Sequence, residues 1–188
     1  MTIIVGLIKG DTVYLGADSA CTTMNSLNRT IIKDRKVFIK NDCIAFGVCG
    51  LPKVNDALAH GIELPRQKAA TSDKSYLVTE LVPVLRRGLI NLDCVHQSKP
   101  TSEYEFTGAM LIGYRGELYQ LQCNFQLVSA AQGFDAVGSG AAAALGSLRE
   151  SSKILSPTRR INAALQRAVE NNAGCAPPFV IVSVKKGA

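Results

Sequence analysis

The order of strand-like and helix-like segments constrains this 188-residue chain more than any other feature. Short apolar, β-branched runs occur in groups, and so do segments with helical spacing. The pattern predicts strands, two helices, more strands, two helices and a last strand. Grouped strands indicate antiparallel sheets, because parallel sheets need alternating strands and helices. We therefore expect an α+β fold, a four-layer αββα sandwich of two antiparallel sheets flanked by helices.

Apolar runs bounded by turn residues define the expected strands. They cover residues 3–8, 12–15, 37–39, 43–48, 109–112, 118–123, 125–128 and 179–184. Helices are expected over 52–60, over 72–90 with a kink at Pro83, from about Ser139, and from Ser156-Pro157 to about Asn172. Residues 99–102 are expected to form a loop.

The composition limits the classes of protein to which the chain can belong. The chain is 47% hydrophobic and only 19% charged, which excludes a disordered chain. Its length fits one domain over residues 1–188. The net charge is +6, but the basic residues are scattered and form no stripe, so no nucleic-acid partner is expected. The chain has no membrane-length apolar stretch and no signal peptide, so we expect a cytoplasmic protein that does not bind a membrane.

The cysteines and histidines show no metal-binding spacing. No two of the six cysteines form a C-x-x-C pair, and neither His60 nor His96 adjoins a cysteine pair. Glycine-rich phosphate loops are also absent from the sequence. We therefore expect neither a metal nor a cofactor.

Thr2 is a candidate nucleophile. A small second residue allows Met1 to be removed, which would leave threonine first and 187 residues in the mature chain. A terminal threonine carries a hydroxyl and an α-amine, and an α-amine ordinarily has a pKa of about 7.7–8.0, suited to a base at neutral pH. Threonine activated by its own amine is a known nucleophile–base pair.

Four short motifs add to the evidence that Thr2 is a functional residue. They are Thr2-Ile3-Ile4-Val5-Gly6 followed by Gly10, Leu15-Gly16-Ala17-Asp18-Ser19, Lys36-Val37-Phe38-Ile39 running on to Val48-Cys49-Gly50, and Gly138-Ser139-Gly140. In order and spacing they resemble the proteasome β-subunit family of N-terminal nucleophile hydrolases. The abrupt Met-Thr start is most similar to the minimal bacterial proteasome homologues. The resemblance spans nearly the whole chain.

The resemblance implies roles for five residues. Thr2 would be the nucleophile, and Lys36 would lower the pKa of its hydroxyl. Asp18 would hold Lys36, the Gly50 N–H would form the oxyanion hole, and Ser139 would orient the terminal amine. Taken singly, the residues also fit ordinary structural roles. Asp18 fits a turn and Lys36 a solvated strand lysine. Gly50 fits a glycine between a strand and a helix, and Ser139 fits a helix cap.

The resemblance also implies the rest of the site. The Asp and Ser of the family fall on Asn172 and Cys175, so the amine loses an anionic neighbour. Lys33 is the other candidate for the role of Lys36, although in an extended segment the two would face opposite sides. Val48 on the pocket floor favours apolar substrate side chains. The implied substrate-binding residues are Cys21, Asp34, Phe38 and Val48.

The function that follows is a threonine-type endopeptidase acting inside an oligomeric ring. Its partners would be a peptide or unfolded-protein substrate, further copies of the chain and a regulatory ATPase of unknown identity. Two alternatives stay open: a catalytically inactive ring or scaffold subunit of the same fold, and an amidase for small amides. The identity of the mature first residue separates the first alternative from the enzyme.

Overall fold

The computed structural model describes residues 1–22, 28–97, 103–151 and 155–187. In this part of the chain the strands form two large antiparallel sheets and two small hairpin sheets. The first large sheet has the order β12 (Phe134–Gly138), β1 (Ile3–Lys9), β2 (Thr12–Ala17) and β13 (Val180–Lys185). The second has the order β11 (Leu127–Ser129), β10 (Glu117–Leu121), β9 (Gly108–Tyr114), β6 (Ile44–Gly50) and β5 (Val37–Lys40). The small sheets pair β3 (Ala20–Thr22) with β4 (Arg29–Ile31) and β7 (Val95–Gln97) with β8 (Tyr104–Phe106).

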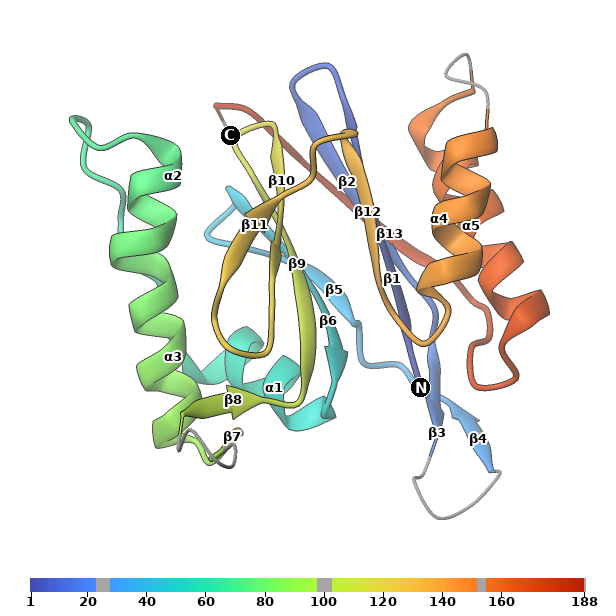
Figure 1. Ribbon diagram of the computed structural model, residues 1–188, viewed down its shortest axis with the longest axis horizontal. Coiled ribbons are helices and arrows are strands. Elements are labelled where there is room, and N and C mark those ends of the chain that lie inside the picture. Colours follow the sequence, from blue (N-terminus) through green and yellow to red (C-terminus); the bar gives the residue numbers. More distant parts are fainter. Residues whose placement is uncertain (23–27, 98–102, 152–154, 188) are drawn as a thin grey trace.

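Helices cover the outer face of each large sheet (Figure 1). On the side of the second sheet lie α1 (Pro52–Asp56), the π-helical η1 (Ala57–Gly61), α2 (Asp73–Tyr76), the π-helical η2 (Leu77–Leu81) and α3 (Val82–Asn91). On the side of the first sheet lie α4 (Ala141–Glu150) and α5 (Pro157–Asn171). The expected four-layer αββα sandwich is confirmed.

Strand β1 shows why the apolar runs are nearly continuous. Ile3 and Val5 face α4 and α5, whereas Ile4 packs between the two sheets. All three are fully buried. A strand covered on both faces has no solvent-exposed positions for charged side chains, which accounts for part of the low charge of the chain.

Some elements were not expected from the sequence. The short strands β3, β4, β7, β8 and β12 carry no clear alternation, and they form because the fold gives each of them a partner. The most important is β12, which pairs with β1 in a register that sets Gly138 opposite Ile3. Before Pro83 the helix widens into the π-helical η2. The expected loop 99–102 lies outside the described residues.

Among the described residues, none of the helices is both long and apolar enough to cross a membrane.

Candidate active site

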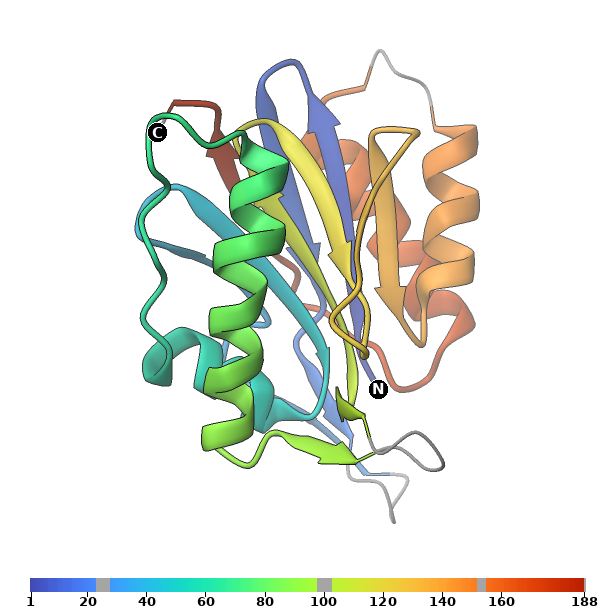
Figure 2. The same cartoon turned by 60° about the vertical axis from the view of Figure 1, so that its left-hand side comes forward.

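Thr2 is fixed at the start of β1 by the turn between β12 and α4. The Ser139 N–H donates to the Thr2 carbonyl at 2.9 Å, and the Thr2 N–H donates to Ser139 Oγ at 3.3 Å. Figures 1 and 2 show the amino terminus at the end of the sandwich where β3 also begins. A residue far along the chain thus holds the candidate nucleophile in place.

Asp18 is a buried carboxylate that joins three segments. It follows β2, and its Oδ1 accepts the Ile3 N–H at 3.1 Å and the Lys36 ammonium at 2.8 Å. Its Oδ2 accepts the N–H groups of Ala20 at 3.0 Å and Ala176 at 3.3 Å. The side chain of Asp18 is 0% exposed and that of Lys36 is 10% exposed. The pair is therefore shielded from water and well hydrogen-bonded.

Lys36, rather than Lys33, reaches the buried carboxylate of Asp18. Its Nζ also donates to the Ala20 carbonyl at 2.5 Å, whereas Lys33 is exposed. Residues 33–36 form an irregular segment with bends instead of a strand, so alternation between strand faces does not apply to them. Burial and hydrogen bonding distinguish the two lysines.

Gly50 occupies a position that only glycine fits. Its φ is +122°, and a Cβ built there would lie 1.9 Å from the Thr107 carbonyl oxygen. It pairs with Gly108, whose φ is +125°, across β6 and β9. A side chain at either position would push the two strands apart, which explains the glycine at the end of β6.

Ser139 is held from a second direction by Asn172. The Asn172 Nδ2 donates to the Ser139 carbonyl at 3.1 Å, and its Oδ1 accepts the Gly174 N–H at 3.0 Å. The N-cap of α4 is Gly140, not Ser139, and no side chain caps it. Ser139 therefore serves Thr2 instead of the helix end.

Cys175 lies behind Ser139, with its Sγ 3.9 Å from Ser139 Oγ. Burial, and after it the charge of Asp18, raises the pKa of the Cys175 thiol. The thiol is fully buried and is protonated at neutral pH, so it acts as an uncharged packing partner.

Met1 occupies the site together with Thr2. The Thr2 hydroxyl donates to the Met1 carbonyl at 2.8 Å, and the Met1 amine donates to Thr22 Oγ1. The Met1 side chain lies over Gly174. While Met1 is attached, the Thr2 nitrogen is an amide and has no lone pair available for a proton.

A cavity of about 180 Å³ opens beside Thr2. It is lined by Met1, Thr2, Ala20, Cys21, Thr22, Ile32, Asp34, Lys36, Val48, Gly50, Leu51, Pro52, Asn55 and Asp56. A neighbouring hollow is lined by Thr2, Gly50 and Ser139, among others. The expected residues Thr2, Lys36 and Gly50 therefore share one cavity with Cys21, Asp34 and Val48.

Phe38 lies elsewhere. Its ring packs on Phe46, with centroids 5.8 Å apart, against the core between the second sheet and its helices. It is not among the residues that line the cavity. Its neighbour Val37 faces the opposite side, into the space between the sheets, so β5 uses both faces for packing.

The sequence interpretation did not include Asn55 and Asp56. Both belong to α1, which begins at Pro52, two residues after Gly50. Residues three and four positions apart share one helix face, so Pro52, Asn55 and Asp56 all reach the cavity. The sequence feature that could have identified them is the expected start of a helix at residue 52, close to Gly50, the expected oxyanion-hole residue.

Within the described ranges, no three His, Cys, Asp or Glu side chains are grouped closely enough to hold a metal ion. His60 and His96 are exposed, one in η1 and the other in β7.

No protein-family model matches the chain, and no curated protein matches it. Solved structures match it over its full length. BPH from Thiobacillus denitrificans is 14% identical with a TM-score of 0.80, and 99% of each chain is covered. The same protein in complex with epoxomicin is 15% identical with a TM-score of 0.78, and 100% of each chain is covered. Eukaryotic HslV from Trypanosoma brucei is 16% identical with a TM-score of 0.64, covering 98% of this chain and 99% of the other. At these identities the likeness is one of fold, and the chain has the fold of HslV and BPH, as its resemblance to the proteasome β-subunit family implies.

Proposed function

We propose that this chain is a threonine-type endopeptidase of the proteasome β-subunit family, acting as a homo-oligomeric ring in the cytoplasm. The observation that carries the proposal is the buried Asp18–Lys36 ion pair in the site that also holds Thr2. A buried ion pair costs desolvation energy, so its position at the candidate nucleophile favours a chemical role. The shared fold with HslV and BPH supports the same function.

Removal of Met1 converts Thr2 into a nucleophile with its own base. The amide becomes an α-amine, and the hydroxyl loses its bond to the Met1 carbonyl. The Thr2 oxygen then attacks the substrate carbonyl, and its proton passes to the amine. Collapse of the tetrahedral intermediate gives an ester and releases the amine product, which takes up that proton. The Thr2 amine next activates water, which hydrolyses the ester and restores the hydroxyl.

The neighbouring groups stabilise these steps. The Lys36 charge favours the Thr2 alkoxide and disfavours protonation of the α-amine. Asp18 fixes the lysine at 2.8 Å, and Ser139 with Asn172 orients the amine. The Gly50 N–H donates to the developing oxyanion, and a donor of this kind contributes about 2.7–4 kcal/mol in other enzymes.

One observation favours a second function, that of a catalytically inactive scaffold subunit. With Met1 attached, the Thr2 hydroxyl and nitrogen are both engaged, as in a subunit that serves only as a scaffold. An intact-mass measurement of natively produced protein separates the two, since an enzyme must lack Met1.

Hydrolysis of fluorogenic peptides by single variants tests the proposal. We expect Thr2→Ala to abolish hydrolysis and Thr2→Ser to retain part of it, because serine keeps the hydroxyl. Thr158→Ala is the matched control, since Thr158 is exposed at the start of α5. Undiminished hydrolysis by Thr2→Ala overturns the proposal. Epoxomicin, which is bound to BPH in one structure of this fold, is a ligand to test, and we expect its binding to this chain to require Thr2.

A further inference from the structure

We infer that the cavity beside Thr2 selects a cationic side chain, lysine or arginine, on the substrate residue whose carbonyl is attacked. The inference rests on the proposed function, because it assigns a substrate class to the same site. It concerns the charge of the cavity, which the resemblance to a family does not determine.

Two carboxylates line the cavity. Asp34 comes from the segment before β5, and Asp56 ends α1. Both are exposed, and neither forms an ion pair within the described part of the chain. An ionised carboxylate accepts hydrogen bonds only, so each leaves its acceptor capacity to a ligand.

Asn55 is a further polar residue of the same wall. Its Nδ2 donates to the Arg35 carbonyl at 3.1 Å, which fixes the orientation of the amide. Its Oδ1 is buried and has no hydrogen-bond donor among the described residues. Because this oxygen has almost no accessible surface, the side-chain acceptors that can receive a cationic ligand are the two carboxylates.

Basic side chains also lie near the cavity, and Lys36 is the one of them that lines it. Lys36 lines it, but its charge is matched by Asp18 at 2.8 Å. Lys53, at the start of α1, donates to the Asp93 carbonyl at 3.1 Å. Lys33 and Arg35 flank Asp34 along the chain, and neither lies within ion-pair distance of it. The charged side chains that line the cavity are therefore one lysine, which is paired with Asp18, and two unpaired carboxylates, although the chain as a whole carries +6.

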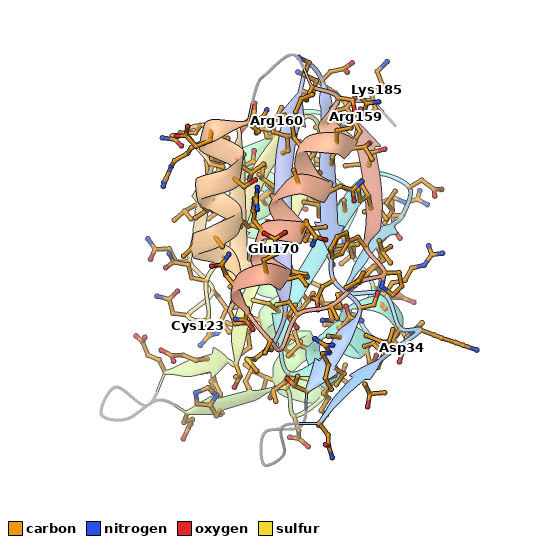
Figure 3. The ribbon with its side chains drawn as sticks, turned by 90° about the vertical axis from the view of Figure 1, so that its right-hand side faces the viewer. Asp34, Cys123, Arg159, Arg160, Glu170 and Lys185 are labelled. Carbon is orange, nitrogen blue, oxygen red and sulfur yellow. The ribbon has the colours of Figure 1, made fainter. Side chains whose placement is uncertain are left out.

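Part of that positive charge lies at the other end of the molecule. In Figure 3, Arg159, Arg160 and Lys185 are near the top of the view and Asp34 is near the bottom. At physiological salt the Debye length is about 8 Å, so charges across the molecule are screened from the cavity.

The remaining walls suit the stem of a long side chain. Ala20, Ile32 and Val48 are apolar, and Val48 is 4% exposed. Lysine and arginine bury their methylene groups along apolar surface and keep the charged end at polar groups. By itself the apolar floor with Val48 favours an apolar substrate side chain. In this cavity the floor is combined with two exposed carboxylates, Asp34 and Asp56. Arginine, with five donors and no acceptor, matches the two unpaired carboxylates best.

Peptides that differ only at the residue before the cleaved bond test the inference. With the assembled enzyme we expect kcat/KM for arginine or lysine to exceed that for leucine by about tenfold, and glutamate to be poorest. The preference should shrink at about 1 M salt, where the Debye length is about 3 Å. A higher kcat/KM for leucine, with hydrolysis still dependent on Thr2, overturns the inference and leaves the proposed function intact. If no peptide is hydrolysed in a Thr2-dependent way, the proposed function fails and the inference with it.

Charge-neutral variants connect the preference to the two carboxylates. The double variant D34N/D56N should lower the ratio of kcat/KM for arginine over leucine by about tenfold. Glu150→Gln removes the same kind of charge at the exposed end of α4 and should leave this ratio as it is. An unchanged ratio in the double variant contradicts the inference even if arginine is preferred.

Discussion

The ammonium of Lys36 lies 2.8 Å from the carboxylate of Asp18, and the Asp18 side chain is fully excluded from water. Three backbone N–H groups, from Ile3, Ala20 and Ala176, surround the same carboxylate. These donors come from β1, β3 and the segment before β13, so one side chain fastens the elements that carry the site. The pair therefore has a structural role, and substitution can separate it from the chemical role that we propose.

Substituting either partner should abolish hydrolysis but affect stability unequally. Asp18→Asn leaves the Lys36 charge buried without a partner and presents an amide to backbone donors, which should cost about 3–5 kcal/mol of unfolding free energy. Lys36→Met should cost less, because Asp18 keeps its three N–H donors. Denaturant unfolding measures both values. An Asp18→Asn variant as stable as the parent contradicts this assignment.

Gly50→Ala should destabilise the protein and abolish activity. The new methyl group would lie 1.9 Å from the Thr107 oxygen, at a φ that alanine rarely adopts. Strain at such a position costs about 1–3 kcal/mol before the strand displacement is counted.

Gly146→Ala is the matched control with the opposite sign. Gly146 lies inside α4, and nothing is within 4 Å of a Cβ built there. Alanine should stabilise the helix by about 0.5–1 kcal/mol. Thermal or denaturant unfolding of the two variants should therefore shift in opposite directions, and a shared direction counts against the backbone argument.

Ser139→Ala should reduce hydrolysis with little effect on stability. The substitution removes the Oγ that contacts the Thr2 nitrogen at 3.3 Å but keeps the Ser139 N–H bond to the Thr2 carbonyl. The loss of one such bond costs about 1 kcal/mol, whereas misorientation of a base costs much more in rate. We expect kcat to fall by about tenfold or more while KM changes little. Ser147→Ala in α4 is the control, and an equal effect of both variants would show that Ser139 has no special role.

The sequence predicted the layers of the fold well, and it placed Thr2, Lys36 and Gly50 at positions that line one cavity. Apolar runs and caps placed most elements, because burial on both faces and the Ser156 cap leave strong local patterns. The interpretation missed β12, since Phe134–Gly138 has no alternation and becomes a strand through pairing with β1. Ser139 directly follows β12, so the long-range pairing of β12 with β1 determines where Ser139 lies.

The substrate side was predicted less completely. The resemblance to the family implied Cys21, Asp34, Phe38 and Val48 as substrate-binding residues, and all of these except Phe38 line the cavity. The Phe38 ring lies on the helix side of β5 instead, packed on Phe46. Asp56 was missed because only the contact of α1 with the end of β6 brings it to the cavity, and no local pattern encodes that contact.

Alkaline pH should destabilise the fold through two buried tyrosines. Burial raises the pKa of Tyr76 and Tyr119 to about 12, above about 10 in the unfolded chain. Between pH 10 and 12 the unfolded state binds fewer protons, so stability falls as pH rises, by up to roughly 2–3 kcal/mol for each tyrosine. Denaturant unfolding at a series of pH values measures this slope.

Tyr76→Phe separates the titration from the packing. It loses the hydroxyl bond to the Pro65 carbonyl, 2.6 Å in length, so it should be less stable at neutral pH by about 1 kcal/mol. Above pH 10 its stability should fall less steeply than that of the parent. An identical slope in both proteins counts against Tyr76 as one of the groups that titrate.

The central claim is that Thr2 becomes the first residue and acts as the nucleophile. Natively produced protein, incubated with an electrophilic peptide that acylates hydroxyl nucleophiles and then digested, can be mapped by mass spectrometry. The predicted result is an amino-terminal peptide that begins with Thr2 and carries one adduct. An amino-terminal peptide that still holds Met1 and carries no adduct, from protein that hydrolyses peptides, would contradict the account.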